Sequence, residues 1–324
     1  MIVNLFGIDV GGTKSSVSYG TFGDGHLTII RKIMFKTQDP KETIAEIENS
    51  IDAMMGNYGL GVTDIAAIGI SCGGPLDSHA GVIMSPPNLP GWDDIHIVRE
   101  ISNKYMGVSV GIQNDANACA LAEWKFGAGR GTKNMVFMTF GTGLGAGLIL
   151  NGHLYEGTND NAGEIGHIRL YGFGPIGYGK SGSFEGFCSG GGIAQIARIL
   201  VREKLQMGEK PAICPSLDRL DGIDAKMVAE AARKGDGIAM ETYRISGEYL
   251  GRGLSILIDV LNPERIVIGS VYARCTDLLE PYSSQIVQRE ALKNAAAVCK
   301  VIPAELGESI GDYAALSVAA NLLK

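Results

Sequence analysis

The sequence of 324 residues predicts an α/β fold, and three patterns carry this prediction. Short apolar runs typical of buried strands alternate with amphipathic stretches typical of helices. One arrangement of strand, small-residue turn and strand is found twice, in GIDVGGTKSSVSYG from Gly7 and in TFGTGLGAGLILNG from Thr139. Glycine is abundant, with 46 residues, but follows no collagen-like period and forms no flexible linker. Two similar hairpins opening two halves predict a duplicated fold with a cleft between the halves.

The first half of the chain predicts a sheet with helices. Apolar runs bounded by turn residues predict strands at 3–10, 15–20, 27–35, 65–71 and 108–113. Amphipathic spacing predicts helices at 40–56 and 94–105, on either side of a loop that contains four prolines.

The second half of the chain again alternates predicted strands and helices. It predicts a helix at 116–126, strands at 135–140 and 144–150, an irregular glycine-rich stretch to about 192, a long helix at 237–261, strands at 265–269 and from 298, and a helix at 312–323. We therefore predict an N-terminal α/β lobe of residues 1–113, joined by the C-terminal helix 311–324, and a C-terminal α/β lobe of residues 114–310.

Residues 134–152 contain no charged side chain and are long enough to suggest a membrane span. Five glycines argue against a helix here, because each costs roughly 1 kcal/mol relative to alanine. The runs VFMTF and LIL are instead typical of short buried strands, so we predict a β-hairpin.

Charge and cysteine usage exclude several classes of partner. The chain has 28 basic and 35 acidic residues, a net charge of −7, and no basic block that could neutralise a run of phosphates. We therefore predict neither a nucleic acid nor a membrane as a partner. The six cysteines form no Cys-x-x-Cys pair and the N-terminus has no basic segment before its apolar run, so we expect a reduced, cytoplasmic protein.

The segment GTGLGA at residues 141–146 matches the dinucleotide fingerprint of dehydrogenases. That fingerprint requires a helix directly after it, whose N-terminus faces the pyrophosphate. Here the β-type run GLIL follows, so the dehydrogenase interpretation fails. A Walker A sequence is absent as well.

The two glycine turns predict a different phosphate site, in which small residues let backbone N–H groups approach anionic oxygens. The first turn supplies Asp9, Gly11, Gly12, Thr13 and Lys14. A carboxylate facing phosphate requires a cation, so a Mg²⁺ ion near Asp9 is implied if that side chain points into the cleft. The alternative is a structural turn with a solvated lysine.

These motifs together resemble, in order and spacing, the bacterial ROK family of sugar kinases, transcriptional repressors and relatives. They are GIDVGGTK, GGPLDSHAGVI with PPNLPGW, NDANACALAE, FGTGLGAGLILNG and GEIGH, with LNPERIVIG extending the likeness toward the C-terminus. The resemblance implies an actin-like ATPase/hexokinase fold of two α/β lobes and a homodimer. It also implies that the two hairpins hold ATP and that sugar binds in the cleft.

The resemblance selects candidate site residues. Asp115 follows a strand at the edge where ligands of α/β proteins bind, and its carboxylate would accept the proton of the attacking sugar hydroxyl; the alternative is a helix cap. The family pattern assigns sugar binding to Asn88, Asn114, Asp115, Glu164, His167 and Glu185. It assigns ATP binding to Asp9, Gly11, Gly12, Thr13, Lys14, Gly141, Thr142, Gly143 and Gly269.

The chain departs from the family at its zinc site. Many members hold zinc with a histidine of GExGH and three cysteines, and here Ile176, Tyr178 and Ser183 stand at the cysteine positions. Structural zinc takes four nitrogen or sulfur ligands, so His167 alone does not suffice and we predict no structural zinc. We expect the aromatic side chains of Tyr171, Phe173 and Tyr178 to hold the 171–182 loop instead, or the loop to order only when sugar binds.

We predict an ATP-dependent kinase of a hexose or N-acetylhexosamine, with Asp115 as general base and Mg²⁺ as charge partner. A sugar-sensing protein that kept the cleft and lost turnover is the alternative. A DNA-binding repressor would need a helix-turn-helix segment before the first hairpin, and only eight residues precede Asp9.

Overall fold

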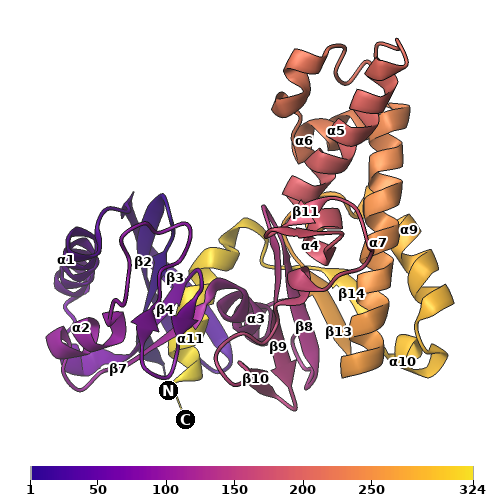
Figure 1. Cartoon of the computed structure of the whole chain (residues 1–324). Helices are drawn as coiled ribbons and strands as arrows, with labels where there is room; N and C mark the ends of the chain where they lie inside the picture. Colours follow the sequence, from indigo (N-terminus) through magenta and orange to yellow (C-terminus); the bar gives the residue numbers. More distant parts are fainter. Residues whose placement is uncertain (1, 324) are drawn as a thin grey trace. The chain divides into compact units, whose positions relative to one another are not determined.

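The computed structural model describes residues 2–323 (Figure 1). The chain forms two compact units: residues 1–133, 147–162 and 305–324 make unit 1, and residues 134–146 and 163–304 make unit 2. Each unit contains a five-stranded sheet or most of one, and the chain passes between the units inside strand β9 (Leu144–Leu150). The predicted α/β class is confirmed.

The sheet of unit 1 has the strand order β3-β2-β1-β4-β7. Strands β1 to β3 form an antiparallel meander, whereas β1, β4 and β7 run parallel. The strands are β1 (Val3–Val10), β2 (Lys14–Gly23), β3 (His26–Lys36), β4 (Ile65–Cys72) and β7 (Ser109–Asn114), close to the predicted ranges. The parallel strands bring the residues that follow β1, β4 and β7 to one edge of the sheet.

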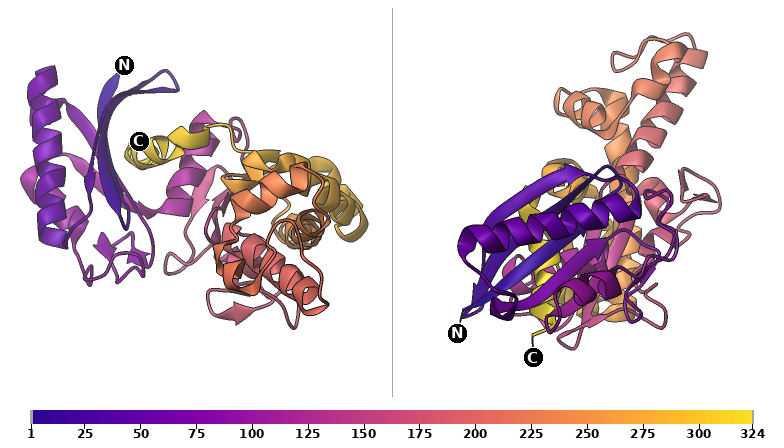
Figure 2. Two further views of the ribbon diagram at one scale, coloured as in Figure 1. Left: turned by 90° about the horizontal axis from the view of Figure 1, so that it is seen from above. Right: turned by 90° about the vertical axis from the view of Figure 1, so that its left-hand side faces the viewer.

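Two faces of this sheet are covered by different helices. Helices α1 (Pro40–Tyr58) and α11 (Ile310–Asn321) lie on opposite faces (Figure 2, left). Helix α1 has the N-cap Asp39 and the C-cap Gly59, which is in the left-handed region, so it begins at the predicted residue and extends two residues beyond the predicted end at 56. Its Ile47 and Ile51 join a core with Phe6 and Ile8.

Helix α2 (Ile97–Lys104) is shorter than the predicted helix 94–105. The residues before it are extended, because Ile95 and Ile83 exchange backbone hydrogen bonds of 2.9 and 3.0 Å. The helical spacing of apolar residues in the sequence extends past the start of the helix, into residues that pair with another segment as a strand does.

A row of glycines lets α11 approach the sheet. Gly7 of β1 pairs with Gly69 of β4, which pairs with Gly111 of β7. A Cβ atom at Gly7 would lie 2.8 Å from the backbone nitrogen of Leu316, and one at Gly69 only 2.2 Å from that of Ala319. Part of the glycine excess in the sequence therefore serves helix-on-sheet packing.

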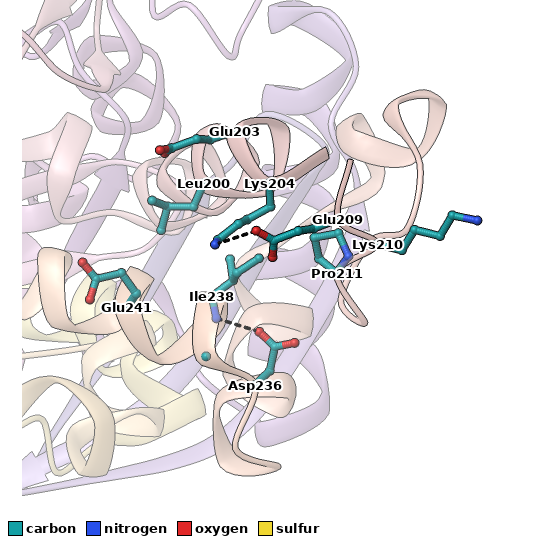
Figure 3. Close-up of a pocket in the computed structure, with 10 residues that line it drawn as sticks. Leu200, Glu203, Lys204, Glu209, Lys210, Pro211, Asp236, Ile238 and Glu241 are labelled. Atoms are coloured by element: carbon teal, nitrogen blue, oxygen red, sulfur yellow. Dashed lines mark hydrogen bonds and ion pairs between the residues drawn. The ribbon is translucent and has the colours of Figure 1, made fainter. Parts of the chain in front are cut away.

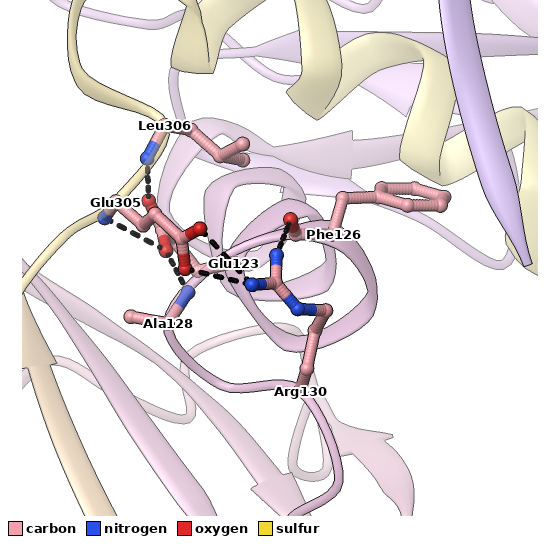
Figure 4. Close-up of polar contacts among 6 residues, drawn as sticks. All are labelled: Glu123, Phe126, Ala128, Arg130, Glu305 and Leu306. Carbon is pink, nitrogen blue, oxygen red and sulfur yellow. Dashed lines mark hydrogen bonds and ion pairs between the residues drawn. The ribbon is translucent and has the colours of Figure 1, made fainter.

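A buried carboxylate fixes the segment that leads into α11. Glu123 of α3 (Asp115–Phe126) is fully buried and accepts backbone N–H groups from Ala128, Glu305 and Leu306 at 2.8 to 3.2 Å (Figure 4). Arg130 forms an ion pair with Glu305 beside it. Because a buried carboxylate needs such donors, this network ties α3 to the entrance of α11.

The second sheet has the strand order β10-β9-β8-β13-β14. Its strands are β8 (Met135–Phe140), β9, β10 (His153–Tyr155), β13 (Arg265–Ile268) and β14 (Lys300–Pro303), with β13 parallel to both β8 and β14. Strands β8 and β9 cover the ranges predicted for the uncharged segment. Strand β14 begins two residues after the predicted start at 298, because α10 (Lys293–Val298) extends to that position.

Helices dominate the rest of unit 2. Helices α5 (Gly190–Gln206), α6 (Ala225–Arg233) and the N-terminal part of α7 (Gly237–Leu261) extend away from the sheet (Figure 1). Helix α7 has the predicted bounds, and α9 (Thr276–Glu290) packs along it. The remaining short elements are β5 (Leu76–Asp77), β6 (Val82–Ile83), β11 (Ile176–Gly177), β12 (Lys180–Ser181), α4 (Phe184–Phe187), α8 (Val271–Arg274) and four 3-10 turns.

Among the residues described, no helix has both the length and the apolar composition required to cross a bilayer.

We predict that Gly69→Ala lowers the free energy of unfolding by about 3 kcal/mol, because the added methyl group meets the backbone of α11. The matched variant Gly111→Ala should cost about 1 kcal/mol or less, since its methyl group meets the movable side chain of Leu322 at 2.9 Å. Urea denaturation of both variants measures the difference. Equal losses would contradict the assignment of the close backbone contact with α11 to Gly69.

Candidate active site

The first glycine turn, residues 11–13, joins β1 to β2 in unit 1, with Asp9 near the end of β1 and Lys14 at the start of β2. Thr37, directly after β3, fixes this turn: its hydroxyl donates to the Gly11 carbonyl at 2.6 Å, and its N–H donates to the Thr13 carbonyl at 3.1 Å. Thr13 and Lys14 are exposed. Sequence reasoning missed Thr37, although its position at the end of the adjacent strand β3 was a usable signal.

Asn88 lies against this turn. A Cβ atom at Gly12 would be 2.3 Å from the Asn88 carbonyl oxygen, so only glycine fits this close approach. The Asn88 side-chain amide lies 3.4 Å from the position that a Cβ at Gly73 would take. The structure thus brings the predicted sugar residue Asn88 next to the predicted phosphate residue Gly12.

Asp115 is the first residue of α3, immediately after β7. Asn114 is the N-cap, and its side-chain oxygen accepts the Asn117 N–H at 2.7 Å. Asp115 Oδ1 accepts the Ala116 N–H at 2.8 Å. The helix cap is therefore Asn114, and Asp115 is available for another role.

The Asp115 carboxylate is accessible to solvent, yet protein atoms crowd it closely. This desolvation raises the pKa of Asp115 above the usual aspartate value. The hydrogen bond from the Ala116 N–H acts in the opposite direction but is the smaller effect. A raised pKa brings a carboxylate closer to the value that suits a general base near neutral pH.

Asp9 shares this environment. The pKa of Asp9 is raised to about 6, chiefly because the side chain is buried; Lys32 acts to lower this pKa, and the charges of Asp115 and Asp312 act to raise it. Asp312, in the first turn of α11, is paired with Lys32 of β3. Lys32 therefore interacts with both Asp9 and Asp312, and the charge of Asp115 acts on Asp9 as well.

Such a cluster is suited to a divalent cation bound with phosphate. Mg²⁺ in phosphoryl-transfer sites is held by one or two carboxylates, the substrate phosphates and water. A cation near Asp9 would relieve the repulsion from Asp115 and Asp312. The residues fit the predicted ion, although no group of three or more ligating side chains is found among residues 2–323.

The second glycine turn, Gly141–Gly143, joins β8 to β9 in unit 2. The Gly141 N–H donates to the Gly143 carbonyl at 3.1 Å, and the Thr139 hydroxyl accepts the Gly145 N–H at 2.9 Å. The Gly141 carbonyl accepts the N–H of Gly190, the first residue of α5, at 2.8 Å. Thr142 is exposed at the tip of the turn.

The predicted sugar residues of unit 2 lie beside this turn. Glu185, in α4, accepts the Leu144 N–H at 3.0 Å through Oε2. Glu164 and His167 border a 3-10 turn closed by a hydrogen bond from the His167 N–H to the Glu164 carbonyl, 3.2 Å long, which brings both to one side. A Cβ atom on Gly166 within this turn would be 3.3 Å from the Glu185 Cβ atom.

Gly269 directly follows β13, and its N–H donates to the Met138 carbonyl of β8 at 3.0 Å. The next residue, Ser270, has φ 53° and ψ −116°, a strained conformation for a non-glycine residue. Its hydroxyl oxygen lies 3.9 Å from the position that a Cβ at Gly141 would take. Ser270 is therefore a further candidate at the second turn, and no sequence pattern indicated it.

The 171–182 loop is held differently from our expectation. Tyr171 and Tyr178 make edge-to-face contacts with Tyr249 and His167, each with ring centroids 6.3 Å apart, but Phe173 is 82% exposed, so its predicted packing role is wrong.

Polar contacts hold the loop in addition. Lys180 Nζ donates to the His167 carbonyl at 2.7 Å, and the Gln195 side chain exchanges hydrogen bonds of 3.0 and 2.8 Å with the Ile176 backbone.

These positions do not fit a zinc ion. Ile176 offers no donor, and the Ser183 hydroxyl is engaged as the N-cap of α4, where it accepts the Gly186 N–H at 3.0 Å. Tyr178 stands against His167 through its ring edge. The donor set reduces to one imidazole, which is insufficient for structural zinc.

A cavity of about 470 Å³ lies elsewhere in unit 2, between the end of α5 and the start of α7 (Figure 3). Its lining includes Leu200, Ile238 and the Lys204–Glu209 ion pair, and none of the predicted site residues. It is therefore separate from the chemistry described above.

Comparison with known proteins identifies the class. The structure superposes with a TM-score of 0.72 on a ROK family glucokinase from Streptomyces griseus in complex with glucose and AMPPNP, at 26% identity, covering 99% of this chain and 100% of that one. The fold is thus that of the actin-like ATPase/hexokinase class, as the sequence predicts.

The sequence then gives the family. Residues 5–321 match the ROK family, and the chain belongs to it. It is 32% identical over 308 residues to a glucokinase from Halalkalibacterium halodurans, covering 94% of this chain and 91% of that protein. It is also 28% identical over 272 residues to the DNA-binding transcriptional dual regulator NagC from Escherichia coli, covering 82% and 64%.

The raised pKa of Asp9 predicts a pH-dependent stability. Because folding raises this pKa from 3.8 to about 6, the folded state holds the proton more tightly, and the resulting stability is lost as the pH rises through about 6. Relative to Asp9→Asn, the wild type should lose up to about 3 kcal/mol between pH 4 and 7. Urea denaturation in EDTA measures this; parallel pH curves would contradict it.

The donor set at the 171–182 loop predicts that the purified, chelator-washed chain carries less than about 0.1 zinc per molecule. EDTA should leave its thermal midpoint unchanged, since no metal closes the loop. Elemental analysis provides the measurement, and about one zinc per chain would refute the prediction.

Proposed function

We propose that this chain transfers the γ-phosphoryl group of ATP to a hydroxyl of a hexose or an N-acetylhexosamine. The observation that carries the proposal is Asp115, a carboxylate at the carboxyl end of a parallel strand that is not the helix cap and whose pKa is raised by its surroundings. The similarity to glucokinases supports the substrate class.

In the proposed reaction the sugar hydroxyl oxygen attacks the γ-phosphorus and ADP leaves. Asp115 accepts the hydroxyl proton as the new P–O bond forms, which keeps the nucleophile from carrying a positive charge. Asn88 and Asn114 would bind and orient the sugar from unit 1, and Glu164, His167 and Glu185 from unit 2. Because hydroxyl-reading sites reject ligands that leave polar groups unpaired, these side chains would also set specificity.

The two glycine turns would bind the phosphates. Gly11, Gly12 and Thr13 offer backbone and hydroxyl donors in the first turn, with Lys14 adding a positive charge, and Gly141, Thr142, Gly143 and Gly269 do so at the second. Asp9 would hold Mg²⁺, which supplies charge neutralisation for the phosphates when bound. Transfer then depends on positioning and electrostatics and requires little covalent chemistry from the protein.

The proposal includes a homodimer, which the family resemblance supports. It also places the protein in the cytoplasm, which the scattered, unpaired cysteines support. Size-exclusion chromatography with light scattering measures the oligomeric state.

We expect Asp115→Asn to lower kcat by about 10²- to 10⁴-fold while sugar affinity changes by less than about tenfold, because the amide keeps the size of the side chain but cannot accept the proton. ADP release is measured with glucose, fructose, mannose, allose, N-acetylglucosamine and N-acetylmannosamine. Asp24→Asn, in an exposed turn far along the sequence, is the matched control.

Near wild-type turnover of Asp115→Ala on the preferred sugar would overturn the assigned base. Measurable sugar binding by the wild type without turnover on any sugar would instead favour the non-catalytic sugar sensor, a role consistent with the similarity to NagC.

A further inference from the structure

Glu185, a predicted sugar-binding residue, also contacts the second glycine turn. Its Oε2 atom accepts the N–H of Leu144, the residue directly after the second glycine turn, at 3.0 Å. A Cβ atom at Gly143 would lie 2.7 Å from the same oxygen. One carboxylate oxygen is therefore committed to the turn, and within the described part of the chain Oε1 has no protein partner.

The backbone around Glu185 is fixed from several sides. Ser183 caps α4 by accepting the Gly186 N–H at 3.0 Å. Glycines 166 and 177 pack against the Glu185 Cβ atom, where added Cβ atoms would lie 3.3 and 2.7 Å away. The backbone that carries the Glu185 side chain is therefore held in place. A side chain that positions another part of a site requires such support.

The other end of the turn is anchored by the same segment. The Gly190 N–H donates to the Gly141 carbonyl at 2.8 Å, at the start of α5. Glu185 and Gly190 thus hold the two ends of the second turn, one through a side chain and one through the backbone. Removing the side-chain anchor leaves the Leu144 N–H without its carboxylate partner, and the hydrogen bond from the Gly145 N–H to the Thr139 hydroxyl then remains on that side of the turn.

We propose that Glu185 is a positioning residue for the nucleotide, holding the turn Gly141–Gly143 in the conformation that binds phosphate, in addition to any contact with sugar. This rests on the proposed function, which assigns ATP to that turn. A preorganised turn spares the nucleotide the free energy of ordering it, so the effect acts on nucleotide affinity even when sugar is absent.

The test is the dissociation constant of AMPPNP with Mg²⁺ in sugar-free solution, measured by calorimetry. Glu185→Ala and Glu185→Asp should bind about 5- to 30-fold more weakly than the wild type, because neither side chain reaches the Leu144 N–H. Glu185→Gln should bind within about threefold of the wild type, because its amide oxygen can accept that N–H. Glu203→Ala, on the exposed surface of α5, is the matched control and should be unchanged.

The order of the variants separates this role from a purely sugar-binding one, which would leave all of them with the same sugar-free affinity. Equal affinities would overturn the inference while leaving the kinase proposal intact. Failure of the wild type to bind AMPPNP would overturn both. Circular dichroism identifies an unfolded variant. If Glu185→Ala does not fold, the difference in AMPPNP affinity between Glu185→Gln and Glu185→Asp tests the inference, because these two variants change the side chain least.

Discussion

The close contact between α11 and the first sheet is the constraint on which unit 1 depends. Gly7, Gly69 and Gly111 stand side by side on three parallel strands, and the missing side chains of Gly7 and Gly69 let a helix backbone come within van der Waals distance of the sheet. The helix then covers the apolar face with Leu316 and Ala319. Its first turn also brings Asp312 toward Asp9, so the packing and the electrostatics of the site share one cause.

Each unit places its candidate residues at the carboxyl ends of strands. In unit 1 these are Asp9 in the last two residues of β1 and Asp115 after β7, and in unit 2 the second glycine turn after β8 and Gly269 after β13. Parallel pairing collects such positions at one edge, and glycine lets backbone and carboxylate approach there. The chemistry is therefore assembled from short turns whose shape is enforced by neighbours such as Thr37, Glu185 and Gly190.

The local pattern of the sequence predicts much of this fold. Strand β1 and helix α7 have the predicted bounds, because period-two and period-3.6 spacing and a clear stop at Asn262-Pro263 act over neighbouring residues. The candidate residues follow from motifs and family likeness. What could not be predicted depends on contacts between distant segments: the partners of Glu123, the strain at Ser270, and the polar contacts that replaced the expected packing of Phe173.

The bond from Glu123 to the residues before α11 has a consequence for biosynthesis. Glu305, whose N–H it accepts, emerges from the ribosome 182 positions later, after all of unit 2. Until then the buried carboxylate lacks two of its three donors and the glycine face of the sheet lacks its helix. Unit 1 therefore cannot complete its fold in the order of its synthesis, and the nascent chain must keep an apolar sheet face exposed while unit 2 is being made.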